Sequence, residues 1–227
     1  MGVNYNRKAG KIEPGKSFGI FTEGEVTEKE YFEGLCSMIR YPDKLVDFRR
    51  SVHSDPKGLV DDAVEAKKIN REKAKKGKES LIDEWIVIVD TEGDRPNMNQ
   101  AINKAIDNDI ILLISDLSFE YWLLLHFENT TRNFTNVNQL ISELGKHIDS
   151  YKTHNKHVDM KLLFPQVYDA LRNSAIVRKN LTSQEIMSPR TDCDIFAYYL
   201  MKTSPNVKMS SDITHRDKND LSMYRGC

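Results

Sequence analysis

Short apolar runs recur along the first half of the chain. Residues 17–22 (SFGIFT), 85–89 (WIVIV) and 110–114 (IILLI) are rich in β-branched and aromatic side chains and stop at acidic or turn-forming residues. Residues 44–53 form a weaker run, in which apolar and charged side chains alternate. Such runs are typical of strands, and the uninterrupted ones are typical of strands buried on both faces.

Amphipathic segments fill the intervals between these runs. Residues 27–39 show helical spacing of apolar positions, with Thr27 as the expected N-cap and Glu30 three residues later, as in a capping box. Pro56 can open a second helix, and residues 96–106 fit a third. Because strands alternate with helices, we predict an α/β fold with a parallel sheet flanked by helices.

The pattern changes after residue 128. A polar stretch leads into segments whose apolar residues have helical spacing, which predicts a helical C-terminal portion that packs on the sheet. The last residues are polar and lack a period. We therefore divide the chain into a flexible basic N-terminus (1–16), an α/β domain (17–128), a helical C-terminal part (129–203) and a polar tail (204–227).

Composition narrows the class of protein. The chain has 33 Lys and Arg against 34 Asp and Glu, a formal net charge of −1, which argues against a uniformly basic nucleic-acid-binding surface but not against local patches. No apolar run is long enough to cross a membrane, and the first 16 residues lack the apolar core of a secretory signal. Three scattered cysteines form no disulfide framework, so we expect a cytoplasmic protein without a membrane partner.

Acidic residues follow three of the predicted strands. Glu23 comes after the first strand, Asp90 and Glu92 after the third, and Asp116 with Glu120 after the fourth. Ligands of parallel sheets gather beyond the carboxyl ends of the strands. Converging carboxylates repel each other unless a cation lies between them, and Mg²⁺ prefers such oxygen ligands. The alternative is that these acids only cap helices, where the helix dipole favours them.

Basic and histidine residues have competing interpretations. Residues 67–78 (KKINREKAKKGK) hold seven basic residues and one acid, which suits either contact with a phosphate backbone or a solvated helix face. The pair His154 and His157 lacks the partners of a structural zinc site. His126 lies in an apolar helical run, and we expect it, like Trp85 and Trp122, in the core. The candidate nucleic-acid-binding residues are Lys67, Lys68, Arg71, Lys73 and Arg95. The residues expected to flank the acidic edge are Arg49, Arg50, Arg71, Lys73 and Arg95.

Two longer motifs carry a resemblance to a known family. Residues 21–32 (FTEGEVTEKEYF) resemble the EGxxTExxYF opening of RloB-like proteins, a branch of the Toprim superfamily. Residues 115–127 (SDLSFEYWLLLHF) resemble the SNPxFExWLLLHF block of that family. Between them, residues 87–92 (VIVDTE) stand where the Toprim DxD motif ends a strand, and residues 188–192 show weaker similarity to a late segment. The resemblance spans about residues 17 to 200.

The resemblance implies a Toprim-like fold and a set of site residues. Glu23 matches the Toprim glutamate that acts as general acid/base or metal ligand. Asp90 and Glu92 match the metal-binding pair, Glu120 matches a glutamate offered to a second ion, and Glu28 corresponds loosely to a further acidic position. RloB-like proteins are associated with bacterial restriction or abortive-infection loci, often beside an ATPase of the AAA or ABC type.

This chain departs from the family pattern at the acidic motif. Where Asp-x-Asp is usual, it has Asp90-Thr91-Glu92, and glutamate reaches one methylene further than aspartate. Asp94 can substitute for Glu92 or supplement it. Asp116 replaces the usual asparagine and adds a negative charge.

The sequence thus supports two hypotheses from different classes. The first is a Mg²⁺- or Mn²⁺-dependent phosphodiesterase that cuts DNA or RNA, tRNA included, in anti-phage defence together with an ATPase partner. The second is a non-catalytic Toprim protein that acts as sensor or regulatory partner of a defence ATPase. A homo-oligomer is compatible with both.

Overall fold

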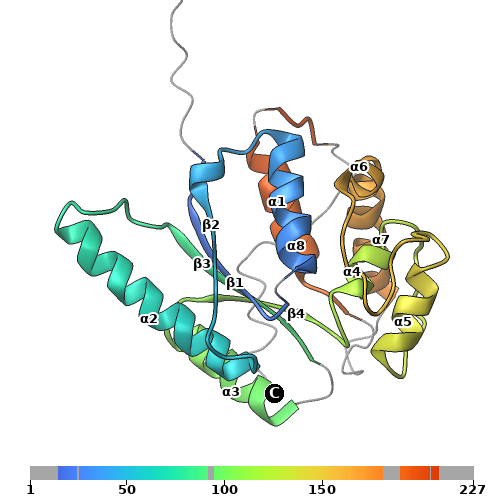
Figure 1. Cartoon of the computed structure of the whole chain (residues 1–227), viewed down its shortest axis with the longest axis horizontal. Coiled ribbons are helices and arrows are strands. Elements are labelled where there is room, and N and C mark those ends of the chain that lie inside the picture. Colours follow the sequence, from blue (N-terminus) through green and yellow to red (C-terminus); the bar gives the residue numbers. More distant parts are fainter. Residues whose placement is uncertain (1–14, 25, 92–94, 181–189, 205, 210–227) are drawn as a thin grey trace, which may run out of the picture.

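A four-stranded parallel sheet lies at the centre of the fold (Figure 1). The computed structural model describes residues 15–24, 26–91, 95–180, 190–204 and 206–209. The strands are β1 (Phe18–Thr22), β2 (Val46–Arg49), β3 (Glu84–Asp90) and β4 (Ile111–Ser115), in the order β2-β1-β3-β4. Every neighbouring pair is parallel, so the carboxyl ends of all four strands lie at one edge.

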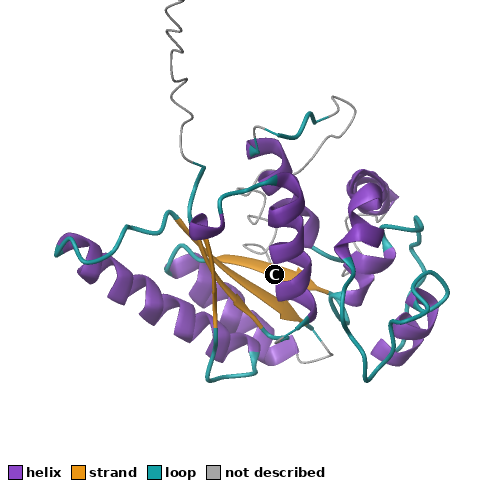
Figure 2. Ribbon diagram, turned by 45° about the horizontal axis from the view of Figure 1, so that its top comes forward, coloured by secondary structure: helices purple, strands orange, loops and turns teal. Residues whose placement is uncertain are grey.

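Helices cover both faces of this sheet. Helices α2 (Pro56–Lys75) and α3 (Arg95–Asp107) lie on one face, and α1 (Thr27–Ile39) lies on the other (Figures 1 and 2). Alternate residues of β3 serve the two layers, since Val87 packs with α2 and α3 whereas Ile88 packs in the layer of α1. The predicted α/β class is therefore confirmed.

The starts of two helices show how local chemistry sets their positions. Asp55 caps α2, because its Oδ1 accepts a hydrogen bond of 3.0 Å from the Gly58 amide, and Pro56 occupies the first turn as predicted. The expected N-cap role of Thr27 is wrong. Val26 is the N-cap of α1 and has no polar side-chain atom to cap the helix, while the Thr27 hydroxyl donates to the Lys156 carbonyl.

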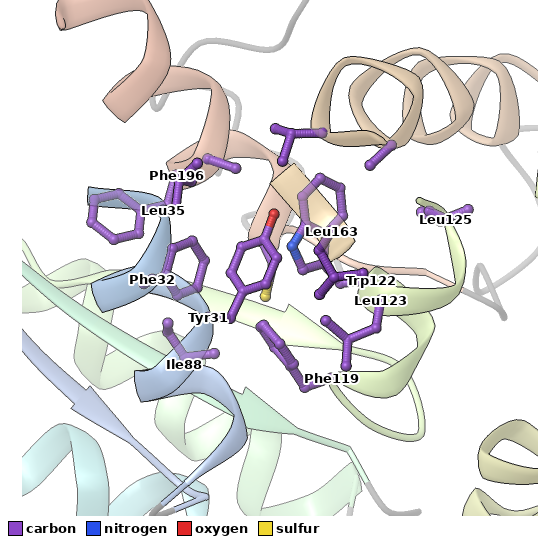
Figure 3. Packing of buried hydrophobic residues seen from close by; sticks show 14 of the residues in the cluster. Tyr31, Phe32, Leu35, Ile88, Phe119, Trp122, Leu123, Leu125, Leu163 and Phe196 are labelled. Atoms are coloured by element: carbon purple, nitrogen blue, oxygen red, sulfur yellow. The ribbon is translucent and has the colours of Figure 1, made fainter. Parts of the chain in front are cut away.

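The C-terminal segment is helical, as predicted. It packs on the α1 side of the sheet, where Tyr31, Phe32, Trp122, Leu163 and Phe196 meet in one buried cluster (Figure 3). Helix α4 (Glu120–Leu124) precedes this segment, and the elements of the segment are α5 (Val137–Leu144), α6 (Met160–Leu163), α7 (Val167–Asn180) and α8 (Cys193–Thr203), with the 3-10 turn η2 (Phe164–Gln166). A further 3-10 turn, η1 (Asp43–Leu45), precedes β2. The domain boundaries at residues 128 and 203 stay a prediction.

His126 is a core histidine, as predicted. Its Nδ1 lies 3.0 Å from the Trp122 carbonyl and its Nε2 lies 3.0 Å from the Tyr31 hydroxyl. Burial lowers the pKa of His126 to about 4, so the ring is neutral at pH 7. Nδ1 then donates to the carbonyl and Nε2 accepts from Tyr31. Trp85 and Trp122 are buried as well.

Two sequence predictions concern the chain ends and membrane association. The basic N-terminus is described only for residues 15 and 16, and the polar tail only for residues 204 and 206–209. Among the helices that the structure describes, none combines the length and apolar character required to cross a membrane.

Candidate functional site

A cavity of about 410 Å³ opens at the carboxyl edge of the sheet. Its wall comes from the turn between β1 and α1, the end of β3, the start of α4 and a loop at residues 153–157. Four of the predicted site residues line this cavity together: Glu23, Glu28, Asp90 and Glu120. The chain thus brings carboxylates from four elements to one pocket, as the positions after the strands predict.

Glu23 joins the ends of β1 and β3. Its backbone amide donates to the Ile88 carbonyl at 3.1 Å, which extends the pairing of the two strands by one residue. Its Oε2 accepts a hydrogen bond of 3.0 Å from the Asp90 amide. The Glu23 side chain is therefore held against the backbone that carries Asp90.

Asp90 holds a buried oxygen without a hydrogen-bond partner. Although the residue as a whole is partly exposed, its Oδ1 is buried and makes no hydrogen bond among the described residues. Burial raises the pKa of Asp90 well above its usual range, and the charges of Glu28, Glu120 and Glu23 raise it further. The Phe119 backbone amide acts to lower the pKa of this carboxyl, but its effect is outweighed. Without a cation, the pocket therefore disfavours the ionised form of this carboxyl.

Glu28 reaches back from the first turn of α1 to the preceding turn. Its Oε1 accepts a hydrogen bond of 3.1 Å from the Gly24 amide, and the residue is 4% exposed. A Cβ on residue 24 would overlap the Glu28 carboxylate, so any other residue there would displace this side chain from its present position. Burial raises the pKa of Glu28, and the neighbouring charge of Glu120 adds to the effect.

Glu120 has a direct cationic partner in the pocket. The residue is 2% exposed, and its Oε1 lies 2.8 Å from Lys156 Nζ and accepts a bond of 3.0 Å from the Tyr151 hydroxyl. Burial acts to raise the pKa of Glu120, but the hydrogen bond from Lys156, the Ser118 hydroxyl, the charge of Lys156 and a backbone amide together outweigh it and lower the pKa. Glu120 is therefore the carboxylate of the pocket that is stabilised in its ionised form.

Lys156 is a site residue that the sequence reasoning missed. In the sequence, His154 and His157 suggest only an incomplete zinc site, whereas the loop that carries them supplies the Lys156 ammonium to the acidic pocket. Burial acts to lower the pKa of Lys156, but Glu120, Asp90 and Glu28 raise it. No periodicity or motif in the loop points to this contact, because it joins residues 36 positions apart in the chain.

The family model for RloB-like proteins matches residues 18–198 of the 227. The chain belongs to this family. The match runs from β1 into α8 and so includes every described residue that lines the pocket. No curated protein matches the chain, and no solved structure matches it.

Two of the metal ligands expected in this RloB-like chain, Glu92 and Asp94, lie outside the described residues. The side chain of Arg95, expected to contact nucleic acid, is also outside them. Asp116 is described but does not line the pocket; its Oδ1 accepts a bond of 3.0 Å from Thr91 Oγ1. Asp116 therefore supports the turn before α4 rather than the cluster itself.

The donor set of the RloB-like pocket fits a hard divalent cation. Carboxylate oxygens are the ligands that Mg²⁺ and Mn²⁺ prefer, and the buried, unpartnered Oδ1 of Asp90 is of this type. Over the part of the chain that the structure describes, no three His, Cys, Asp or Glu side chains already converge as metal ligands. Asp90, Glu120 and Glu28 would hold an ion after adjustment of their side chains.

The basic run of the RloB-like chain lies away from this pocket. Helix α2 begins beside the carboxyl edge and runs back along the sheet, so its last turns lie near the amino ends of the strands (Figure 1). In these last turns, Asn70 Oδ1 accepts a hydrogen bond from the backbone amide of Ile82, a residue just before the start of β3. The expectation that Arg71 and Lys73 flank the acidic edge is therefore wrong, although their contact with nucleic acid stays a prediction.

Lys67 has a structural role within the basic run. It is buried, and its Nζ donates to the carbonyls of Asn108 and Asp109 at 2.9 and 2.6 Å and pairs with the Asp109 carboxylate at 3.2 Å. These bonds hold the turn before β4, in which Asp109 has a left-handed backbone with φ of 54°. Lys68, Arg71 and Lys73 are exposed.

Proposed function

We propose that this RloB-like protein is a Mg²⁺- or Mn²⁺-dependent phosphodiesterase that cuts nucleic acid. The observation that carries the proposal is the buried, unpartnered Asp90 Oδ1 in a pocket shared with Glu23, Glu28 and Glu120. Four carboxylates in one pocket, with the pKa values of Asp90 and Glu28 both raised, create a demand for positive charge. A divalent cation meets that demand, and nucleic-acid phosphates are substrates that such cations bind.

Each residue has a proposed role. Asp90 and Glu120 hold the cation, with Glu28 as a further ligand, and Glu92 and Asp94 complete the set as the motif implies. When bound, the ion would polarise the scissile phosphate and lower the pKa of a water. The Glu23 carboxylate, which is held against the backbone of Asp90, would accept a proton from the attacking water.

The biological setting in this proposal rests on family membership. The resemblance of the motifs implies a role in anti-phage or abortive-infection defence beside an AAA- or ABC-type ATPase. The substrate is then a phage or host nucleic acid, either DNA or RNA, including tRNA. Lys68, Arg71, Lys73 and Arg95 remain the proposed contacts to its backbone, whereas the buried ammonium of Lys67 is already bonded within the fold.

A cleavage assay tests the proposal. Purified protein is incubated with tRNA, single-stranded DNA and duplex DNA in Mg²⁺ or Mn²⁺, with and without the ATPase encoded beside it. Cleavage is expected, and Glu23→Gln and Asp90→Asn are each expected to lower it by about 100-fold or more. Glu65→Gln is the matched control, because Glu65 is exposed on α2. Activity that survives both pocket substitutions would contradict the assigned site.

A second candidate function is favoured by one specific observation. Lys156 already neutralises Glu120, and no three described residues converge as ligands, as expected for a Toprim protein that binds without cutting. Such a protein would be the sensor or regulatory partner of the ATPase. Nucleic-acid or ATPase binding without cleavage in any metal, with the ATPase present, would favour this role over the nuclease.

A further inference from the structure

The loop at residues 151–158 is fixed to α1 through its backbone. The Thr27 hydroxyl donates to the Lys156 carbonyl at 3.0 Å, and the Val158 amide donates to Glu30 Oε2 at 3.0 Å. His157 Nδ1 lies 2.7 Å from the other oxygen of Glu30. These contacts set the position from which the Lys156 side chain extends into the pocket.

The loop also closes on itself, so its shape does not depend on the ion pair. Lys152 and Asn155 exchange two backbone hydrogen bonds of 3.0 and 2.8 Å. Tyr151 is buried at the start of the loop and donates to Glu120. The backbone is therefore held independently of the Lys156 ammonium, which is the mobile part of the contact because four methylenes connect it to the chain.

The ammonium occupies the place where positive charge is needed. It lies 2.8 Å from Glu120 Oε1, and the charges of Asp90 and Glu28 also act on it. The Lys156 side chain is 40% exposed, whereas that of Glu120 is 3% exposed, so the lysine can leave toward solvent while the carboxylate stays. An ammonium and a divalent cation at the same carboxylates would repel each other.

We propose that Lys156 is a tethered cation that occupies the carboxylate pocket in the metal-free protein and competes with a divalent metal ion for Glu120. Binding of the ion turns the lysine outward, toward the mouth of the pocket. The inference rests on the proposed metal site but adds a residue that the family motifs do not contain. The Lys156 ammonium explains how the chain can fold with several carboxylates buried together before any metal ion binds.

Calorimetric titration with Mn²⁺ tests this inference without an activity readout. Lys156→Met removes the competing charge and keeps the length of the side chain. The variant is expected to bind Mn²⁺ about tenfold more tightly than the unchanged protein, as removal of one hydrogen-bonded ion pair predicts. Lys156→Arg keeps the charge and is expected to restore weaker binding. Lys152→Met is the matched control, because Lys152 is an exposed lysine of the same loop that does not line the pocket.

A thermal melt of each variant with and without Mn²⁺ gives a second readout. The increase in Tm on adding Mn²⁺ is expected to be larger for Lys156→Met than for Lys152→Met, because ligand-induced stabilisation follows affinity. If the unchanged protein binds Mn²⁺ and Lys156→Met binds it no more tightly, the competition is refuted while the metal site stands. If neither protein binds Mn²⁺, the proposed metal site itself fails, and the inference with it.

Discussion

Two buried carboxylates of the same pocket, Asp90 and Glu120, are held in opposite ways. Glu120 has a hydroxyl and an ammonium on one oxygen, whereas the Oδ1 of Asp90 makes no hydrogen bond within the described part of the chain. The pKa of Glu120 is lowered and the pKa of Asp90 is raised. Asp90 is therefore the residue whose ionisation opposes folding until a cation binds.

Asp90→Asn is expected to stabilise the metal-free protein at pH 7. A carboxyl whose pKa is raised in the folded state lowers the free energy of unfolding as pH increases. The loss begins near pH 4, the pKa of the group in the unfolded chain, and continues up to its pKa in the folded state. Removing the charge should raise Tm by roughly 2–4 °C, which corresponds to about 1 kcal/mol for a chain of this size. Asp149→Asn, at an exposed position, should leave Tm unchanged. A lower Tm in Asp90→Asn would show that the ionised carboxylate is satisfied without a metal.

His126 predicts a pH dependence of the opposite sign. Its folded pKa of about 4 lies below the unfolded value of 6.5, so its contribution to stability is complete above pH 6.5 and is lost as pH falls toward 4. The loss is roughly 3 kcal/mol over this range. Urea unfolding of His126→Gln at several pH values should show a lower stability at pH 7 but a flatter decline below pH 6.5. A decline as steep as that of the exposed His147→Gln control would contradict this account of His126.

Single elements of this molecule are positioned by long-range polar contacts as well as by their apolar faces. The loop at residues 151–158 is joined to the first turn of α1 by Thr27 and Glu30, and the middle of α2 is joined to the turn before β4 by Lys67. Helical periodicity predicted α1 and α2 well. It could not predict these contacts, because they join segments that are distant in the chain.

A conservative substitution at Thr27 tests the contact between α1 and the loop at residues 151–158. Thr27→Val keeps the shape of the side chain but leaves the Lys156 carbonyl without its donor, at a cost of about 1 kcal/mol. Hydrogen exchange at the amides of residues 152–158 should then become faster, while α2 and the sheet are unaffected. Thr27→Ser keeps the hydroxyl and should preserve protection. Unchanged exchange in Thr27→Val would mean that Thr27 does not hold the loop.

The position of Lys67 predicts a loss of stability that its neighbour does not share. Lys67→Met leaves the carbonyls of Asn108 and Asp109 without a charged donor, so the free energy of unfolding should fall by about 2 kcal/mol. Lys68→Met, which alters the next and exposed lysine, should change it by less than about 0.5 kcal/mol. Equal stability of the two variants in urea would show that the hydrogen bonds of Lys67 do not stabilise the fold.

On the scale of the whole molecule, the pocket carboxylates and the basic run lie at opposite edges of the sheet. The carboxylates line the pocket at the carboxyl edge, and the basic run at residues 67–78 extends along α2 toward the amino edge. The near-zero net charge of the chain thus does not describe either of these local clusters. The parallel topology produces this separation, because a helix that follows a strand runs back toward the strand's starting edge.

The strand ends of the site could be predicted from sequence, but its loop could not. Two of the site residues, Glu23 and Glu120, follow strands, and Asp90 is the last residue of β3. Because the strands are parallel, their carboxyl ends lie at the same edge of the sheet. Lys156 follows no strand and has no periodic neighbours, so only the packed structure places it beside Glu120. The N-cap prediction for Thr27 is wrong for the same reason, because its hydroxyl donates to a carbonyl of the loop at residues 151–158, which the local sequence cannot show.

A crystal of the protein soaked in Mn²⁺ tests the central claim most directly, because the anomalous signal of manganese locates the ion without reference to any assay. The account predicts an anomalous peak in the pocket, within about 2.5 Å of oxygens of Asp90 and Glu120. No such peak is expected in Asp90→Asn. A peak elsewhere, or the same peak in both crystals, would contradict the claim that Asp90 anchors a divalent metal ion.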